Sequence, residues 1–349
     1  MSKRVTIAEV AEAAGVSMMT VSRAINNKGG IGEDTRQRIL QIAQEMGYRP
    51  NNLARGMVTQ RTGTIGLVVP DIGSPFFAQI AKGIENVAYV NGYNVFLMDA
   101  ENVDREIAAL NSLWENRVDG LILCTSRLDQ EQLKLRLERF SFTVLINCLL
   151  ETDMAGVCKI NVDDENGARQ AVDNLASAGH THIAFIAGPD YLLSSQQRLV
   201  GYRSSLSTHQ LPFREEFIRQ CTPDTDGGYA AAVALLNKHP EITAIFAFND
   251  LIAAGALRAC ADLNRHVPND VAIIGWDDSS LTSLLTPTLS TLRIAKRELG
   301  ATAMRILNQL MNGEQLVEDC HQIIKPELVL RQSTAVPSFS TSKPNPKDI

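Results

Sequence analysis

The residues best suited to contacting another molecule begin at position 16, in the stretch VSMMTVSRAINN. Ser17 can cap a helix, because its hydroxyl can accept a hydrogen bond from a backbone N–H of the first turn. At helical spacing, Met18, Met19, Ser22 and Arg23 then lie on the outer face. An arginine there can bond O6 and N7 of guanine, and methionines can meet thymine methyl groups. The alternative to such DNA contacts is a surface helix with an apolar start.

A second group of polar residues stands at the ends of four apolar segments: Asp71, Asn147, Asn249 and Asp277. In open sheets of parallel strands, ligands bind beyond the carboxyl ends of the strands, so we expect these side chains to face a ligand. The alternative for Asp277 is that it caps the helix that follows it.

Signatures of catalysis and of metal binding are absent from the sequence. It contains no nucleophile–base motif, P-loop or GxSxG, and GGIGED at 29–34 does not follow a strand. His180 and His182 form an HxH pair without a third ligand nearby, so we expect no metal. We predict no enzyme activity and no cofactor. Six scattered cysteines, with no CxxC pair, are expected to be reduced thiols: Cys124, Cys148, Cys158, Cys221, Cys260 and Cys320.

Composition and charge indicate a soluble chain with two unlike parts. The 349 residues are 45% hydrophobic and 21% charged, and no apolar run reaches the roughly 18 residues of a membrane helix. The N-terminal stretch lacks the apolar core of a signal peptide, so we expect a cytoplasmic location. Residues 1–61 carry nine basic and five acidic side chains, or +4, whereas the remainder carries −10. A basic head on an acidic body suggests that the head alone meets a polyanion.

The pattern of residues 6–47 predicts three short helices. Thr6 and Glu9 can form a capping box, and Gly15 can end the first helix in the left-handed conformation. Ser17 then begins the second helix, which makes the pair a helix-turn-helix, and DTRQRILQIAQEMG supplies a third. The apolar positions expected to form one small core are Ile7, Val10, Ala11, Ala14, Val21, Ala24, Ile25, Ile39, Ile42, Ala43 and Met46.

The next stretch, YRPNNLARGMVTQRTGT at 48–64, has a different character. Pro50 disfavours helix in the residue before it, and Asn51 or Asn52 can cap a short helix that ends at Met57. A helix this short does not form alone in water, and Gly56 inside it costs about 0.5–1 kcal/mol relative to alanine. The stretch is therefore predicted to be a hinge helix or, alternatively, a flexible tether.

From Thr64 onward, apolar strands alternate with helices. The predicted strands are TIGLVVPD, YNVFLMDA, DGLILC, TVLIN, HIAFIAG, AIFAFND and VAIIGWDD. This alternation predicts an α/β body with parallel sheets and helices on both faces, and about 270 residues suffice for two such subdomains. The final stretch, VPSFSTSKPNPKDI, is rich in proline, serine and lysine and has no leucine heptad. We therefore expect a disordered tail and a dimer, not a coiled-coil tetramer.

The head resembles the lactose/galactose repressor (LacI/GalR) family of bacterial transcription regulators. The resemblance rests on TIAEVAEAAGVSMMTVSRAINN and TRQRILQIAQEMGYRPNNLAR and extends to about residue 335. It implies that Met18 and Met19 select the operator and that Arg23 reads a base. It also implies phosphate or base contacts from Thr6, Ser17, Ser22 and Asn26.

The same resemblance gives the stretch after the head a role on DNA. In the family, this segment folds only when two copies pair over the centre of the operator. An apolar residue there wedges into the minor groove and kinks the duplex, and Met57 matches that position. The residues that the resemblance places on the DNA in this segment are Asn51, Leu53, Ala54 and Met57.

The body resembles type I periplasmic sugar-binding proteins, which the family shares as its effector domain. SPFF at 74–77 is similar to the aromatic pair of the ribose-binding branch, which implies that Phe76 and Phe77 stack on a sugar ring; helix-cap packing is the alternative. Two departures concern the ligand: Cys148 stands where the ribose-type pattern has an arginine, and Pro223 is the nearest match to an aromatic wall. The implied polar contacts are Asn147, Arg198, Asn249 and Asp277. Arg198 is expected to donate a fork of hydrogen bonds to hydroxyl groups and to balance the Asp277 carboxylate, which suits a neutral polyol.

These observations predict a DNA-binding transcriptional regulator, most simply a repressor, that works as a homodimer on a palindromic operator under the control of a small-molecule effector, expected to be a sugar. The predicted division is a helix-turn-helix domain at 1–49, a hinge at 50–62, an effector-binding and dimerisation domain at 63–335 and a tail at 336–349. The alternatives are a nucleoside or purine effector, a corepressor-dependent regulator and a periplasmic sugar-binding protein.

Overall fold

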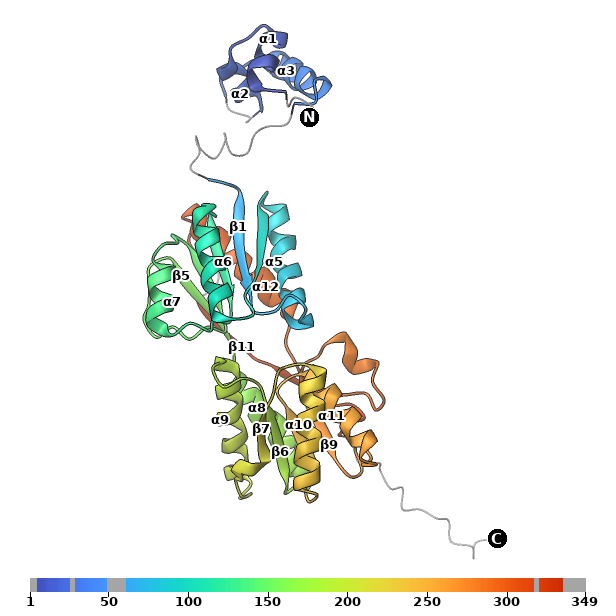
Figure 1. Ribbon diagram of the computed structural model, residues 1–349. Helices are drawn as coiled ribbons and strands as arrows, with labels where there is room; N and C mark the ends of the chain where they lie inside the picture. Colours follow the sequence, from blue (N-terminus) through green and yellow to red (C-terminus); the bar gives the residue numbers. More distant parts are fainter. Residues whose placement is uncertain (1–4, 26–28, 49–60, 317–319, 335–349) are drawn as a thin grey trace, which may run out of the picture. The chain divides into compact units, whose positions relative to one another are not determined.

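The computed structural model describes residues 5–25, 29–48, 61–316 and 320–334. The chain divides into two units, one that ends at Gly63 and one that begins at Thr64 (Figure 1). In the described part of the first unit the secondary structure is α-helical only. The second unit contains two six-stranded sheets with helices around them. The predicted combination of a helical head and an α/β body is confirmed.

Three helices form the head: α1 Ile7–Ala14, α2 Met18–Ile25 and α3 Glu33–Glu45. The predicted capping box is present, because the Glu9 N–H donates to the Thr6 hydroxyl and the Thr6 N–H donates to the Glu9 carboxylate at 2.7 Å. Gly15 ends α1 with a φ of 64°, in the left-handed region. The Thr20 N–H donates to the Ser17 hydroxyl at the start of α2, as predicted.

All the apolar positions predicted for the head belong to one cluster. Two of the basic residues also serve this unit internally. Arg38 Nη2 donates to the Ala14 carbonyl at the end of α1, at 3.0 Å, and Arg36 Nε donates to the Ala24 carbonyl of α2, at 3.4 Å. Carbonyls in the last turn of a helix lack intrahelical partners, so these arginines stabilise the helix ends. Part of the positive charge of the head is therefore structural.

Sheet A consists of parallel strands in the order β11-β5-β4-β3-β1-β2. Its strands are β1 Thr64–Val69, β2 Asn94–Asp99, β3 Gly120–Cys124, β4 Thr143–Ile146, β5 Val157–Val162 and β11 His321–Ile324. Its helices are α5 Pro75–Val90, α6 Val103–Glu115, α7 Gln130–Leu137 and α12 Lys296–Asn312. Neighbouring side chains of a strand enter different cores: Leu67 packs in the cluster of α5 and α12, and Val68 packs in that of α6 and α7. Helices thus cover both faces, as predicted.

Sheet B has the order β12-β10-β9-β8-β6-β7. Its strands are β6 Ile183–Ala187, β7 Ile218–Gln220, β8 Ala244–Ala247, β9 Ala272–Asp277, β10 Ser290–Arg293 and β12 Glu327–Val329. Its helices are α8 Asp164–Ser177, α9 Leu193–Thr208, α10 Thr225–Lys238 and α11 Asp250–Asp262. The edge strand β12 pairs antiparallel with β10, whereas the other strand pairs of the sheet are parallel.

The chain passes between the two halves of the body three times. It does so from β5 into α8, from β10 into α12, and from β11 into β12. In Figure 1, β11 lies where the two halves meet. The last crossing consists only of Lys325 and Pro326. The two halves are therefore joined by short segments. Any rearrangement of the ligand site that moves one half relative to the other must change these segments.

One expectation about the cysteines is wrong. Cys158 and Cys320 form a disulfide, although 162 positions separate them in the chain. Cys124, Cys148, Cys221 and Cys260 are free thiols, as expected. The sequence pattern did not predict this disulfide, because the bond depends on β11 lying beside β5 in the sheet.

Candidate nucleic-acid interface and ligand site

The second helix of the head presents its two methionines to the outside. Met18 and Met19 are 56% and 66% exposed, whereas Val21 and Ala24 are fully buried. Arg23 is exposed as well. Large apolar side chains beside an arginine, at the start of the second helix of a helix-turn-helix, are placed where such helices meet base edges. The other predicted contact residues within the described head are the exposed Thr6 and Ser17 and the half-buried Ser22.

The predicted DNA contacts of Asn26, Asn51, Leu53, Ala54 and Met57 fall outside the described residues. Gly56, which was expected to weaken the hinge helix, also lies outside the described residues. The contacts of this segment therefore stay predictions.

The buried centre of the candidate ligand site is an ion pair between Arg198 and Asp164. Both side chains are at most 5% exposed, and Arg198 Nη2 and Nε lie 2.7 and 2.8 Å from Asp164 Oδ1. Nη1 donates to the Phe248 carbonyl, and the guanidinium carbon lies 3.8 Å from the centre of the Trp276 ring. Burial raises the pKa of the Asp164 carboxyl, and the charge of Arg198 opposes that rise. Asp164, not Asp277 as expected, is thus the carboxylate bonded to Arg198.

Asp277 ends β9 with a φ of 112°, a conformation that costs a residue other than glycine about 1–3 kcal/mol. The Lys296 ammonium donates to its carbonyl oxygen. Burial raises the pKa of its carboxyl to about 8, and the negative charge of Asp250 adds to this effect, while Arg198 and Lys296 oppose it. The raised pKa favours the protonated form of the carboxyl. In that form it can donate a hydrogen bond as well as accept one, which suits a hydroxyl partner.

This carboxyl makes the stability of the body depend on pH. Because its pKa is about 8 when folded and about 3.9 when unfolded, the folded state holds a proton that the unfolded state releases between those values. Its contribution to stability is present below about pH 4 and is lost as the pH rises towards 8. We expect the free energy of unfolding to be lower at about pH 8.5 than at about pH 6, and Asp277→Asn to reduce that difference. Urea unfolding measures it; identical pH dependence in the two proteins would contradict this assignment.

Two predicted site residues also hold loops in place. Asn249 caps α11, because its Oδ1 accepts from the Ile252 N–H at 2.8 Å, and its Nδ2 donates to the Pro223 carbonyl at 3.1 Å. The structure thus brings Pro223 beside Asn249. Asn147 is buried, and its Oδ1 accepts from the Val162 N–H at 2.8 Å. Both amides fix the backbone at the carboxyl ends of strands.

The six predicted ligand residues fall into two groups. Arg198, Asn249 and Asp277 lie around sheet B. Phe248, the chain neighbour of Asn249, accepts a hydrogen bond from Arg198, and Trp276, the chain neighbour of Asp277, contacts the Arg198 guanidinium. The others, Phe76, Phe77 and Asn147, belong to the half that contains sheet A. The rings of Phe76 and Phe77 meet edge to face at 5.1 Å at the start of α5.

Several residues at the site were missed in the sequence. Asp164 and Trp276 contact Arg198 directly, and Trp276 Nε1 is buried without a hydrogen-bond partner among the described residues. Arg127 Nε donates to the Tyr191 hydroxyl at 3.3 Å. Arg127 follows β3 of sheet A and Tyr191 follows β6 of sheet B, so this contact joins the two halves. Asp164, Arg127 and Tyr191 stand just after strands and Trp276 lies near the end of β9, and this position was the available signal. The pairing of these residues had no such signal.

The histidine pair has other hydrogen-bond partners. His180 Nδ1 lies 3.1 Å from the Thr243 hydroxyl, and His182 Nδ1 lies 3.1 Å from the Thr181 hydroxyl. Within the ranges that the structure describes, His, Cys, Asp and Glu side chains form no group of three or more that could hold a metal ion. None of the helices in those ranges combines the length and apolarity needed to span a bilayer.

Comparison with known proteins places both units in one family. The model for bacterial regulatory proteins, lacI family, matches residues 6–51, and that for a periplasmic binding protein-like domain matches residues 172–334. The chain is 33% identical to catabolite control protein A of Priestia megaterium over 332 residues, which cover 95% of this chain and 99% of that protein. The chain belongs to the lacI family. The lacI-family chain is also 32% identical to the ribose operon repressor of Halalkalibacterium halodurans, with 94% and 97% of the two chains covered.

Solved structures agree with this family. The chain resembles the lac repressor dimer bound to operator and the anti-inducer ONPF, with a TM-score of 0.86, 29% identity, and 96% and 100% of the two chains covered. It also resembles a complex of the transcriptional regulator CelR with cellobiose, with a TM-score of 0.72, 30% identity, and 95% and 100% covered. The relatives are transcription regulators rather than enzymes. The lacI-family chain is therefore a DNA-binding transcriptional regulator, as predicted.

Proposed function

We propose that this lacI-family regulator is a repressor that binds a palindromic operator as a homodimer and responds to a small neutral sugar. The DNA-binding part of this proposal rests on one observation. Met18, Met19 and Arg23 point outward from a helix whose other face packs in the core of the head. The sugar-binding part is supported by the buried pair of Arg198 and Asp164 and by Asp277, whose carboxyl pKa is raised.

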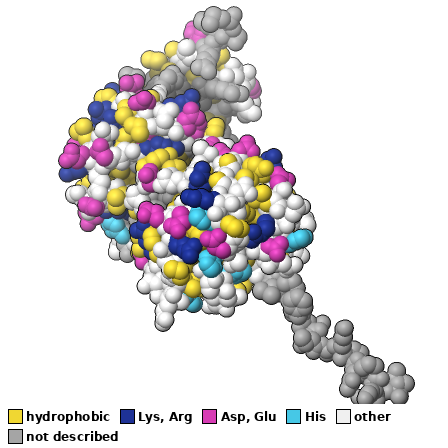
Figure 2. Space-filling model, turned by 60° about the horizontal axis from the view of Figure 1, so that its bottom comes forward, with side chains coloured by type: hydrophobic (Ala, Val, Ile, Leu, Met, Phe, Trp, Pro, Cys, Tyr) yellow, Lys and Arg dark blue, Asp and Glu magenta, His cyan; other side chains and the backbone are white. Residues whose placement is uncertain are grey.

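The charges of the two units support the assignment of DNA binding to the head. Residues 1–61 carry +4 and the remainder −10. On the face of the body in Figure 2, acidic and basic side chains are interspersed with apolar ones. A surface of mixed sign gives a polyanion little attraction, whereas a basic unit attracts phosphates through counterion release.

Met18 and Met19 should decide which operator is chosen. We expect that replacing both with threonine changes the half-site recovered when the protein selects from random duplexes, because thymine methyl contacts are lost and hydroxyl contacts become possible. Arg23→Met should instead weaken binding to the selected site by about 1–3 kcal/mol, the discrimination that one good base contact supplies. Sequencing of the selected duplexes is the measurement.

The exposed Leu40 on α3, outside the second helix, supplies a control for that selection. Leu40→Thr should leave the selected sequence as it is in the wild type. If the double methionine variant also selects the wild-type half-site, the two methionines do not read DNA and the head's role in operator choice is refuted.

The division of the chain belongs to the same proposal. Residues 1–49 form the DNA-binding domain, 50–62 a hinge that pairs with its counterpart over the operator, and 63–335 the effector-binding and dimerisation domain, with 336–349 as a tail. The support is the change from helical to α/β structure around Gly63 and the lacI-family match that ends at residue 51. We place the protein in the cytoplasm, where its DNA partner is.

The proposed effector site comprises Phe76, Phe77, Asn147, Arg198, Asn249 and Asp277. Its polar groups balance without a ligand charge: Arg198 is paired with Asp164, and the raised pKa of Asp277 favours its neutral form. Adding a charged ligand to a buried, balanced site costs several kcal/mol unless new partners are supplied, so a neutral polyol is favoured. A thermal-shift screen with pentoses, hexoses, disaccharides and nucleosides separates a sugar from a nucleoside or purine effector.

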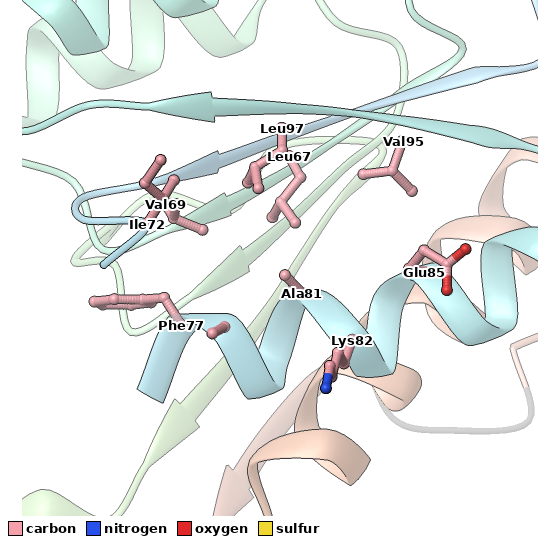
Figure 3. Close-up of a pocket in the computed structure, with 10 residues that line it drawn as sticks. Leu67, Val69, Ile72, Phe77, Ala81, Lys82, Glu85, Val95 and Leu97 are labelled. Carbon is pink, nitrogen blue, oxygen red and sulfur yellow. The ribbon is translucent and has the colours of Figure 1, made fainter. Parts of the chain in front are cut away.

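An apolar groove of about 370 Å³ supports the homodimer. It lies between α5 and the edge strand β2, and Figure 3 shows Leu67, Val69, Val95 and Leu97 on the strands opposite Phe77 and Ala81. Lys82 and Glu85 stand on α5 at its rim. The groove shares Phe77 with the proposed effector site, but none of its other lining residues belongs to that site or to the Arg198 cluster. An exposed edge strand with an apolar groove is a surface that a second copy can cover by twofold symmetry.

Light scattering should therefore give two chains per particle. Leu97, 47% exposed in the groove, tests the surface: Leu97→Asp places a charge in the interface and should give single chains at micromolar concentration. Leu149→Asp is the matched control, because Leu149 is 46% exposed outside the groove, and it should remain a dimer. Four chains per wild-type particle, or a dimeric Leu97→Asp variant, would contradict the proposed interface.

A further inference from the structure

The disulfide lies at the start of the last crossing between the halves of the body. Cys158 is the second residue of β5, and Cys320 directly precedes β11. The first registered pair of these strands is His321 with Lys159, so the two cysteines stand opposite each other one position earlier, with Cα atoms 4.7 Å apart. The bond therefore ties the entry of β11 to β5.

Besides the disulfide, β11 is held by its pairing with β5 and by His321, whose Nε2 lies 3.7 Å from Asp153 Oδ1. It has four residues and forms the edge of sheet A, so only one of its sides is paired, and Ile323 is 68% exposed. The Lys159 N–H donates to the Cys320 carbonyl and the Asp163 N–H to the Ile324 carbonyl, at 2.8 and 2.9 Å. A short, exposed edge strand opens locally at low free-energy cost unless something else restrains it. The disulfide is such a restraint.

The strand so restrained connects the two halves directly. After Lys325 and Pro326, the chain enters β12 of sheet B. β5, the other strand in the pair, leads into α8, which carries Asp164 as its first residue. The disulfide therefore joins two of the three segments through which sheet A is connected to sheet B and to the Arg198–Asp164 pair.

The two sulfurs differ in their access to a reagent. Cys158 is fully buried, whereas Cys320 is half-buried at the sheet edge. Among the free thiols, Cys124, Cys148 and Cys260 are buried, and burial raises the pKa of the half-buried Cys221 to about 11. Thiol exchange requires a thiolate and an accessible sulfur, and Cys320 offers the access.

We propose that Cys158 and Cys320 form a reversible redox switch that ties β11 to β5 when oxidised and frees it when reduced. The oxidant is a low-molecular-weight disulfide such as oxidised glutathione, or an equivalent protein disulfide. The switch changes the rigidity of a connection between the halves of the body, and so adds a redox input to a regulator that also takes a small-molecule input.

The exchange balances in two steps. The Cys320 thiolate attacks one sulfur of oxidised glutathione, and a mixed disulfide forms as one glutathione leaves as the thiol. Cys158 then loses its proton and attacks Cys320 Sγ, which expels the second glutathione. The two protein thiols lose two electrons and two protons, and the glutathione disulfide takes them up to become two thiols. Reduction runs in reverse and begins at Cys320 Sγ, the sulfur nearer the surface.

The first test counts thiols in the full-length protein equilibrated in glutathione buffers of increasing oxidised fraction, quenched with acid, unfolded and alkylated. Intact mass should change from six alkylated cysteines to four, and reversibly so. Cys320→Ser should give five at every ratio, whereas Cys221→Ser, the control, should change from five to three. Six alkylated cysteines throughout would show that the bond does not form, and four throughout would show that it does not switch; either refutes the proposal.

The second test needs no substitution. Amide hydrogen exchange of the oxidised and reduced wild-type protein is compared in peptides that cover β11 and the crossing at 325–326. We expect exchange there to be at least about tenfold faster after reduction, with the central strand β3 unchanged. Equal exchange of β11 in the two states would overturn the proposed effect on the connection, whatever the thiol count.

Discussion

Asp164→Ala is expected to lower the free energy of unfolding of the body by about 3–5 kcal/mol, because removing one partner of a buried ion pair leaves the other charge without compensation. The two side chains are at most 5% exposed, and Asp164 Oδ1 accepts from both Nε and Nη2 of Arg198. The remaining bond from Arg198 to the Phe248 carbonyl cannot neutralise the guanidinium. Urea unfolding followed by circular dichroism measures the change.

Two controls separate this effect from a general loss of packing. Asp226→Ala removes an exposed carboxylate 3.8 Å from Arg258 and should cost no more than about 1 kcal/mol. The double variant Asp164→Ala with Arg198→Met removes both charges and should recover much of the loss, since an apolar replacement of a buried pair is often neutral. If Asp164→Ala costs as little as Asp226→Ala, the pair is not the buried centre described here.

Removing residues 1–61 is expected to weaken operator binding by at least about 10³-fold, the usual gap between specific and non-specific affinity. The reason is that the outward methionines, Arg23 and the positive charge all lie in the head. Arg36 and Arg38 donate to helix carbonyls, so fewer than nine basic side chains per head are available to phosphates. Anisotropy titration of a labelled operator measures the affinity.

The same truncation should keep its response to a sugar. The body is a compact unit that begins at Thr64, and its ligand residues lie at 76 and beyond. The sugar found by thermal shift should therefore raise the melting temperature of the truncated and the full-length protein equally. Unchanged operator affinity after truncation would refute the assignment of DNA binding to the head.

Much of the fold could be predicted because its signals are local. The capping box of Thr6 and Glu9 and the left-handed Gly15 mark helix ends within a few residues. β1 and β3 are uninterrupted apolar runs because both of their faces are buried. β5 was missed because the half-buried Lys159 and Asn161 interrupt its apolar pattern. β11 and β12 were missed because they are short, partly exposed and paired with strands far away in the chain.

The site was predicted less well than the fold, for a physical reason. Arg198 was recognised, but its partner depends on how closely α8 approaches α9. A Cβ at Gly201 would lie 2.1 Å from the Glu165 carbonyl oxygen, so only glycine allows this approach, which brings Asp164 to Arg198. Neither the ion pair nor the disulfide has a local sequence signal, because each arises from the packing of distant segments.

The central claim is that a small sugar acting on the body controls the affinity of the head for a specific operator. The most direct measurement is the dissociation constant of the full-length dimer for the duplex recovered by selection, with and without a saturating amount of the sugar that stabilises the body. We predict a change of about 5–150-fold, the range of coupling between two sites in one protein. A sugar that stabilises the body yet leaves operator affinity unchanged would contradict that claim.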